Sequence, residues 1–278
     1  MFCRCVSLPL EGSRIPITAF NKAAGISEVE MRRLDEMHTA FTRYFGGMLC
    51  LAPVSEVHPG KILEIGAIQA AEQFPDAHIL AVDMSPLPER TLPANMSFKL
   101  VDASQELPLE PDFDIVHARM VFCHVLNAAK VIERAARLLK PGGLLLLEDF
   151  DVSSVAKTGG PAAQRWTLKY IELCASRGMD SELGRKLEKI MSSVNGLSRV
   201  HVHKLSLPMN GAGSDEDLND LGRALRTFYT RGVEAVLRHP GSHDFTDGMV
   251  QDCITELNKQ DCTALFDMYF CWAHRTKN

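Results

Sequence analysis

The stretch "KILEIGAIQAAEQFPDAHILAVDMSP", residues 61–86, decides the fold because it holds two apolar strands joined by a short helical segment. The strands are predicted at 61–67 and 78–85, and the helix between them, over 68–74, is stopped by Pro75. A strand, a crossover helix and a second strand place the two strands parallel in one sheet. The stretch therefore predicts the start of an open α/β sheet.

The alternation of predicted strands and helices continues along the chain. Further strands are predicted at 96–103, 112–121 and 143–151, and a helix over 125–140 ends at "PGG". Near-continuous apolar strands that alternate with helices indicate a parallel sheet covered on both faces. Two later strands, 197–209 and 264–276, suggest a hairpin added at the sheet edge. The expected fold class is a doubly wound α/β fold with a mainly parallel, seven-stranded, Rossmann-like sheet.

The domain organisation follows from the point at which the alternation of strands and helices ends. Residues 1–45 are expected to form an N-terminal arm and a cap helix, and residues 46–278 a single domain. Helical patterns at about 152–196 and 210–260 interrupt the sheet-forming segments. We expect these two inserted segments to form a lid over the binding site.

Composition narrows the class of protein. A net charge of −5 and the absence of a basic patch argue against a nucleic-acid partner. No run approaches the roughly 18 apolar residues of a membrane span, and no secretory signal is recognisable. The eight cysteines match no zinc spacing, so no metal site is expected. A cytoplasmic protein with a small-molecule partner is the expectation, and the oligomeric state is not indicated.

Polar residues follow successive predicted strands at the points where these strands end. In an open doubly wound sheet, ligands bind beyond the carboxyl ends of the strands. Gly66 follows the first strand, Asp83 ends the second and Asp102 ends the third. An acid after the second strand suits a ribose diol, and an acid after the third suits the amine of a base. Each residue alone could be an ordinary turn or cap residue, but the joint placement favours a nucleoside site.

The run from "ILEIG" through "AVDMS", "VDA", "FDIVHARMV" and "AARLLKPGGLLLLED" resembles class I S-adenosylmethionine-dependent methyltransferases. The likeness is greatest to small-molecule methyltransferases of natural-product pathways, including fungal ones, and covers about residues 40–151 together with 264–276. It implies that S-adenosylmethionine is the cofactor. The cofactor-binding residues that it implies are Glu64 and Gly66 beside the methionine part, Asp83 on the ribose hydroxyls, Met84 on the adenine, Asp102 with Ala103 at the adenine amine, and Arg119 on the sulfonium side.

The sequence departs from this family in the glycine-rich turn. The family pattern is G-x-G-x-G, whereas here Gly66 and Ala67 lead directly into the helical segment. Residues 67–77 offer 11 positions for the crossover, which is close to the minimum of about 10–12. We therefore expect weakened or abolished cofactor affinity. The gap is either a real loss or a coding segment dropped from the gene model, and the sequence does not separate the two.

The resemblance implies methyl transfer to a small, lipophilic metabolite, with O-methylation in a secondary-metabolite pathway as the expected reaction. His124 is the first candidate for the general base, followed by Glu148 or Asp149. The alternative is a methyltransferase-like protein without methyl transfer, acting as a partner subunit or a metabolite-binding module. Aromatic residues of the predicted lid, such as Trp166 and Tyr229, are expected to be either core or acceptor pocket.

Overall fold

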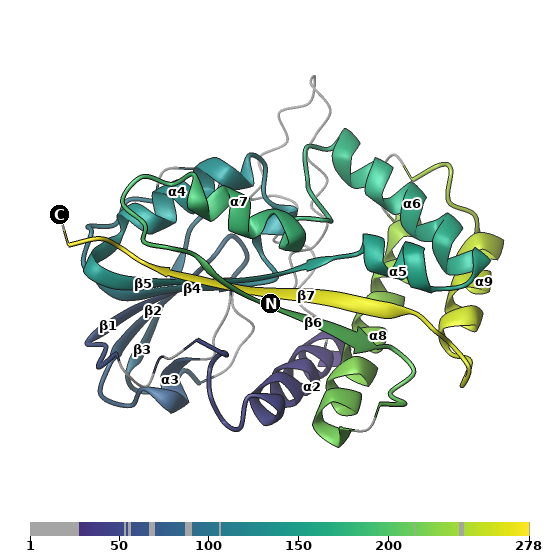
Figure 1. Ribbon diagram of the computed structural model, residues 1–278, viewed down its shortest axis with the longest axis horizontal. Helices are drawn as coiled ribbons and strands as arrows, with labels where there is room; N and C mark the ends of the chain where they lie inside the picture. Colours follow the sequence, from purple (N-terminus) through teal and green to yellow (C-terminus); the bar gives the residue numbers. More distant parts are fainter. Residues whose placement is uncertain are drawn as a thin grey trace.

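The computed structural model describes residues 28–52, 54, 57–66, 70–86, 91–105, 107–213, 215–238 and 242–277, and for 28–34 and 238 the backbone alone. A seven-stranded sheet runs through the molecule with helices on both faces (Figure 1). Its strand order is β3-β2-β1-β4-β5-β7-β6. The strands are β1 (Lys61–Ile65), β2 (His78–Asp83), β3 (Met96–Leu100), β4 (Phe113–Arg119), β5 (Leu139–Asp151), β6 (His201–Pro208) and β7 (Leu265–His274).

The strand directions confirm the predicted fold class. β1 to β5 pair in parallel, whereas β7 pairs antiparallel with both β5 and β6. The two late strands pair antiparallel at the edge of the sheet, as the sequence predicts. Two helices separate β6 from β7 in the chain, and the final strand lies inside, next to β5. The apolar character of β7 explains this position, because an inner strand is covered on both faces.

The helices cover the sheet unevenly. Figure 1 shows α4 and α7 on one face, α2 and α3 on the other, and α5, α6 and α9 grouped beyond the carboxyl end of β5. The helices are α2 (Glu28–Tyr44), α3 (Ala70–Gln73), α4 (Ala128–Arg137), α5 (Ser153–Thr158), α6 (Pro161–Ser176), α7 (Leu187–Ser192), α8 (Glu216–Ala235) and α9 (Asp247–Leu257). Three 3₁₀ turns complete the described elements: η2 (Phe122–His124), η3 (Gly184–Lys186) and η4 (Val236–Arg238).

The crossover from β1 to β2 is as short as the sequence predicts. Its helix, α3, has four residues, and residues 67–69 of the turn lie outside the described residues. The carboxyl end of this helix is closed from a neighbouring segment, because Asn95 Nδ2 donates to the carbonyl oxygens of Ala71, Phe74 and Ala77. One side chain thus satisfies carbonyl groups that a short helix cannot pair internally. The crossover closes with β1 and β2 in full parallel register.

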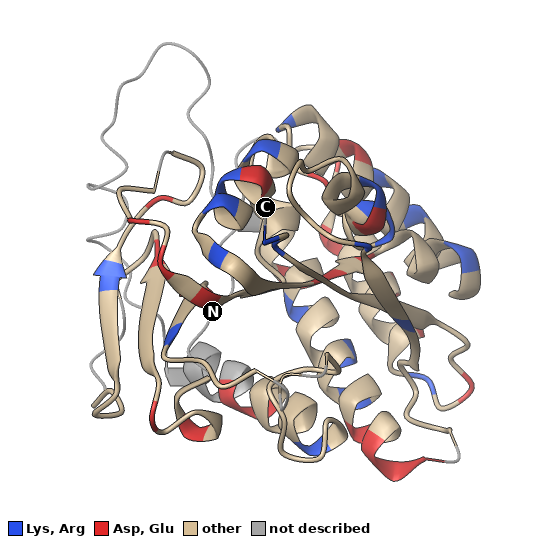
Figure 2. Cartoon of the chain, turned by 60° about the vertical axis from the view of Figure 1, so that its left-hand side comes forward, with Lys and Arg blue, Asp and Glu red and all other residues tan. Residues whose placement is uncertain are grey.

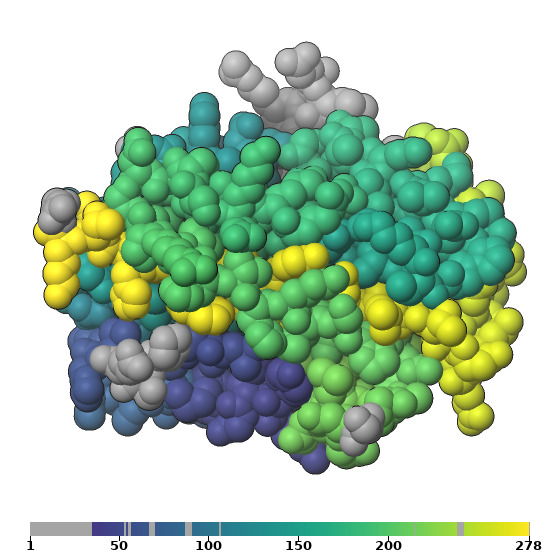
Figure 3. Space-filling view, in the orientation of Figure 1, coloured from purple at the N-terminus to yellow at the C-terminus, as the bar shows by residue number. Residues whose placement is uncertain are grey.

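The cap helix α2 packs against the lid helix α8. Arg43 near the end of α2 pairs with Asp217 and Asp220 of α8, at 2.5 and 2.8 Å. Figure 3 shows the purple surface of α2 adjoining green surface of the lid. Surface ion pairs of this exposure contribute little stability, so the contact aligns the two helices more than it strengthens the fold.

Charged residues of both signs are interspersed over the described surface (Figure 2). Among the described residues, no helix combines the length and apolarity that a membrane crossing requires. Among the described residues, the cysteines are buried and form no disulfide bond with one another: Cys50, Cys123, Cys174, Cys253, Cys262 and Cys271. Within the same described ranges, no group of three potential ligands gathers as a metal site would require.

Candidate cofactor and methyl-transfer site

The ends of three neighbouring strands bring the predicted cofactor residues together. Gly66 N–H donates to Val82 O on β2 at 2.8 Å, and Val101 N–H donates to Asp83 O at 2.8 Å. These bonds place Gly66, Asp83 and the start of the loop that carries Asp102 side by side. The structure therefore assembles the three positions that the sequence placed at the carboxyl ends of β1, β2 and β3.

Both acids are oriented by the turns that follow them. Asp83 Oδ1 accepts from Ser85 N–H at 2.7 Å, and Asp102 Oδ1 accepts from Ser104 N–H at 2.9 Å. Burial raises the pKa of Asp83, against the opposing effect of the backbone N–H groups. A carboxylate has about four lone-pair positions, so one turn bond leaves each acid able to accept from a ligand. The turn interpretation and the ligand interpretation are therefore compatible. The neighbouring Met84 and Ala103 are half-buried.

Gly66 occupies a position that only glycine fits. Its φ is +70°, and an added Cβ would lie 2.5 Å from Val121 Cγ2. Met120, the residue before Val121, is a second left-handed residue at the end of β4, with φ +56°. It is held there by Met120 N–H, which donates to Glu148 O at 2.6 Å. Left-handed backbone at a non-glycine residue costs about 1–3 kcal/mol and tends to persist at functional sites.

Beneath these strand ends lies a row of four buried ionisable side chains. His117 Nδ1 is 3.2 Å from Glu64 Oε1, and its Nε2 is 3.7 Å from Glu148 Oε1. Glu148 in turn pairs with Arg119. None of the four is more than 5% exposed. Since an unpaired buried charge is costly, the row holds two acids against two basic groups.

Arg119 connects this row to the N-terminal segment. Its guanidinium donates to Glu148 and to the carbonyl oxygen of Leu49. It also lies 4.7 Å from the ring centroid of Phe41 and 5.5 Å from that of Phe45. The predicted contact of Arg119 with the sulfonium side stays a prediction, and the described contacts give this residue a role in docking the cap helix.

The environment of the row sets its ionisation. Burial lowers the pKa of His117, but Glu148 and Glu64 outweigh this effect and raise it above 6.5. Burial likewise raises the pKa of Glu148, but Arg119 and His117 outweigh it and hold the value below 4.5. His38 of α2 has a pKa lowered by burial and by Arg119. His38 is not among the site residues predicted from the sequence. Its one signal there is that it is a polar residue beside the apolar stripe of its helix.

His124, the predicted base, ends the η2 turn beyond β4, and its ring meets the ring of Phe150 at 6.0 Å. Burial lowers the pKa of His124 to about 4. The imidazole is therefore neutral near pH 7 and weakly basic. Its role as base stays a prediction.

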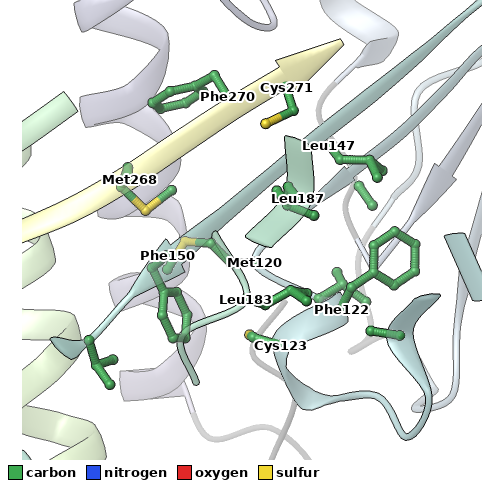
Figure 4. Close-up of a cluster of buried hydrophobic side chains, with 14 of the residues drawn as sticks. Met120, Phe122, Cys123, Leu147, Phe150, Leu183, Leu187, Met268, Phe270 and Cys271 are labelled. Carbon is green, nitrogen blue, oxygen red and sulfur yellow. The ribbon is translucent and has the colours of Figure 1, made fainter. Parts of the chain in front are cut away.

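Asp149 holds the η2 turn in place. Its Oδ2 accepts from Cys123 N–H at 3.0 Å and its Oδ1 from Phe150 N–H at 3.0 Å. Burial raises the pKa of Asp149 to about 6, close to the range in which a general base works well. Figure 4 shows Cys123 and Phe150 at this point, among the apolar side chains where β4, β5 and β7 meet.

The lid aromatics form a connected buried group. Trp166 is 1% exposed and stacks on Tyr170 at 4.9 Å. It meets the edges of Tyr229 and Phe245 at 5.5 and 5.8 Å. Tyr229 Oη and Thr167 Oγ1 are hydrogen-bonded at 2.6 Å. These contacts give Trp166 and Tyr229 the surroundings of core residues.

Comparison with known proteins agrees with this arrangement. A family model described as a methyltransferase domain matches residues 41–195. Methyltransferase str3 of Strobilurus tenacellus is 37% identical over 77% of this chain and 80% of its own length. Methyltransferase str2 of the same organism is 31% identical over 88% of this chain and 92% of its own length.

A solved structure shares the fold. Phosphoethanolamine N-methyltransferase 2 of Haemonchus contortus, in complex with phosphomonomethylethanolamine and S-adenosylhomocysteine, superposes with a TM-score of 0.52 at 17% identity. The superposition covers 95% of this chain and 61% of that one, less than two thirds of its length. The family match over more than half of the sequence, together with the identity to str3, establishes that this chain belongs to the class I S-adenosylmethionine-dependent methyltransferase family.

Proposed function

We propose that this chain binds S-adenosylmethionine and transfers its methyl group to an oxygen of a small, lipophilic secondary metabolite. The observation that carries the proposal is the placement of Asp83 and Asp102 beside Gly66, at the carboxyl ends of adjacent parallel strands. Family membership supports the same reaction class. The interspersed surface charges and the net charge of −5 favour a small-molecule acceptor over nucleic acid, and we propose a cytoplasmic location with it.

The residues at the strand ends fit the adenosine half of this cofactor. Asp83 would accept from the ribose hydroxyls and Asp102 from the adenine amine, because each carboxylate has acceptor positions beyond its turn bond. Met84 and Ala103 would contact the adenine. Gly66 and Glu64 would border the methionine half. Val121 packs against Gly66, so we expect this half of the cofactor to be held less closely than in relatives with a full glycine loop.

The reaction needs few catalytic groups. The bound cofactor supplies an electrophilic methyl carbon. The acceptor oxygen would take that methyl group, with the thioether of the cofactor as the leaving group, and a base of this chain would accept the proton that the oxygen loses. Positioning supplies most of the acceleration in such a displacement. His124 or Asp149 would take the proton, since both lie on the segments that meet beyond β4 and β5.

The lid segments, about 152–196 and 210–260, would enclose the acceptor in the single domain of residues 46–278. Apolar and aromatic walls suit a flat or lipophilic molecule. We expect the acceptor between the strand ends and the buried aromatic group of α6 and α8, with Phe150 on the boundary. Its ring lies 6.0 Å from both His124 and Phe228.

Calorimetry with S-adenosylhomocysteine tests the cofactor part of the proposal. The chain is compared with D83N and with D261N, which changes an exposed acid on the loop before β7. We expect binding by the native chain and by D261N, and weaker binding by D83N. Equal affinity in all three would show that the end of β2 takes no part in binding. Methyl transfer is then followed as S-adenosylhomocysteine release with a panel of phenols and alcohols.

A further inference from the structure

Glu64 has a role inside the protein that its place in a cofactor motif does not explain. Its side chain has no exposed surface. One oxygen, Oε2, accepts from the N–H of Ala70 at 3.1 Å, and the other, Oε1, faces His117 Nδ1 at 3.2 Å. Ala70 is the first residue of α3, immediately after the shortened turn. One carboxylate thus bridges the sheet and the helix that follows the turn.

His117 stands between two acids from different strands. Glu64 comes from β1 and Glu148 from β5, on opposite sides of the imidazole ring. Ionised carboxylates only accept hydrogen bonds, and a neutral imidazole carries a single N–H. A neutral ring would therefore leave one nitrogen lone pair facing a carboxylate in a buried site. With both acids ionised, both contacts are favourable only when both ring nitrogens carry protons.

We propose that His117, in its protonated form, is a positioning residue that holds Glu64 on the amide of Ala70 and so fixes the first residue of α3, where the chain continues after the shortened crossover turn. The inference rests on the proposed function, because it assigns the turn to cofactor binding. A full glycine loop holds a cofactor through its own backbone. Here the turn has a single glycine, and the ion row beneath it supplies an anchor from three strands.

Among the described residues, the charges that face His117 balance in this state. Glu64 from β1 and Glu148 from β5 face it, and Arg119 lies on its own strand. Electrostatic contacts extend this group to other elements: Arg119, Glu64 and Glu72 of α3 act on His38 of α2, and Glu148 and Arg119 act on Cys50. With His117 protonated, the row has two negative and two positive groups. Loss of its proton leaves an excess negative charge in a buried site and removes the ionic attraction between the ring and Glu64, whose Oε1 lies 3.2 Å from Nδ1.

The raised pKa of His117 agrees with this geometry. The anchor is therefore complete at pH 6 and is released as the pH rises through the folded-state pKa. A purely structural contact with a neutral histidine would show no such dependence. The dependence on pH separates the two roles.

The first experiment uses the native chain without ligand. Hydrogen exchange at the Ala70 amide is followed by NMR from pH 6 to 9, corrected for the intrinsic rate, beside the titration of the His117 ring. We expect the protection of Ala70 to fall about tenfold across the range, with the same midpoint as His117. Constant protection while His117 titrates would overturn the inference, and so would a His117 that is neutral at pH 6.

The second experiment compares variants at pH 6. Gln replaces His117 in H117Q, and H243Q changes an exposed histidine before α9 as the matched control. We expect H117Q to lose about five- to twentyfold in affinity for S-adenosylhomocysteine and to lose the pH dependence. E64Q keeps an oxygen for Ala70 but loses the charge, so it should bind with an affinity that no longer varies with pH.

The outcomes separate this inference from the proposed function. No S-adenosylhomocysteine binding by the native chain at any pH would remove the cofactor role of the turn. The exchange data would then still report whether His117 anchors Ala70. Native binding that is unchanged in H117Q and constant with pH would overturn the anchor while leaving the proposed function in place. If H117Q does not fold, the native exchange series decides alone.

Discussion

His117 Nδ1 lies 3.2 Å from Glu64 Oε1, and neither side chain is exposed to solvent. The pair joins β4 to β1 directly below the turn that the family uses for its cofactor. Because Glu64 also accepts from the N–H of Ala70, we expect the stability of the fold and the position of the first residue of α3 to depend on the same proton.

The stability of the protein should fall as the pH rises above neutrality. The folded-state pKa of His117 is raised above 6.5, so its contribution is fully present below that value and is lost as pH rises through the folded-state pKa. Urea unfolding at pH 6 to 9 measures this loss. At pH 6, H117Q should unfold with a free energy about 3 kcal/mol lower, since it removes the buried positive charge that faces Glu64 and Glu148. A native stability that is flat or rising over this range would contradict the expectation.

Replacing Gly66 by Ala should destabilise the chain by about 2–4 kcal/mol. Left-handed backbone costs a non-glycine residue about 1–2 kcal/mol, and the new Cβ would meet Val121 Cγ2 at 2.5 Å. The double variant G66A/V121A should recover the steric part. Gly232 on α8 is the control, because nothing lies within 4 Å of its added Cβ, and G232A should gain about 0.5–1 kcal/mol. If thermal unfolding showed the same change in stability for G66A and G232A, the steric conflict between a Cβ at position 66 and Val121 would be refuted.

Replacing Trp166 tests whether the buried aromatic group of the lid is part of the core or lines the acceptor pocket. If its buried contacts are core packing, W166A should lower the free energy of unfolding by about 3–5 kcal/mol. The neighbouring Leu168 is 50% exposed, so L168A should change stability by less than about 0.5 kcal/mol. A small loss in W166A, combined with lost acceptor turnover, would instead assign this ring to the acceptor pocket.

The general base can be assigned from the pH dependence of turnover. A base works in its unprotonated form, so the rate should fall as pH drops below the pKa of that base. If His124 is the base, the rate should fall below about pH 4, and if Asp149 is the base, it should fall below about pH 6. If His124 is the base, H124A should lower kcat about 100-fold and leave affinity for S-adenosylhomocysteine unchanged. An unchanged kcat in H124A would exclude His124 as the base. A fall of the native rate below about pH 6 that disappears in D149N would assign the role to Asp149.

The sheet could be predicted from sequence because its strands are continuous apolar runs, and the acids at β2 and β3 could be predicted because parallel strands end at one edge. The start of β5 was harder to predict from the sequence. Pro141 and Gly142 signal a turn, yet both lie within this strand, where Gly142 adopts φ +85° and the pairing with β4 is irregular. The helix α5 lies at the start of the predicted lid segment of about 152–196 and begins directly at the strand end, where Asp151 Oδ1 accepts from Ser153 N–H at 2.9 Å.

The contacts of the ion row could not be predicted. Glu64 and His117 are 53 residues apart, and the sequence contains only the hint that each interrupts an apolar strand. A polar residue inside such a strand needs a buried partner, but the identity of the partner depends on the register between β1 and β4. The register pairs Glu64 with His117, and this is known only from the fold.

Calorimetric titration with S-adenosylhomocysteine at pH 6 compares the native chain with a variant in which a Gly-Ser-Gly loop is restored after Gly66. We predict saturable binding by the native chain, tighter binding by the restored variant, and a loss of about 10- to 100-fold in D83N. Binding by the restored variant alone would contradict the claim that the short turn, anchored by Glu64 and His117, still holds the cofactor.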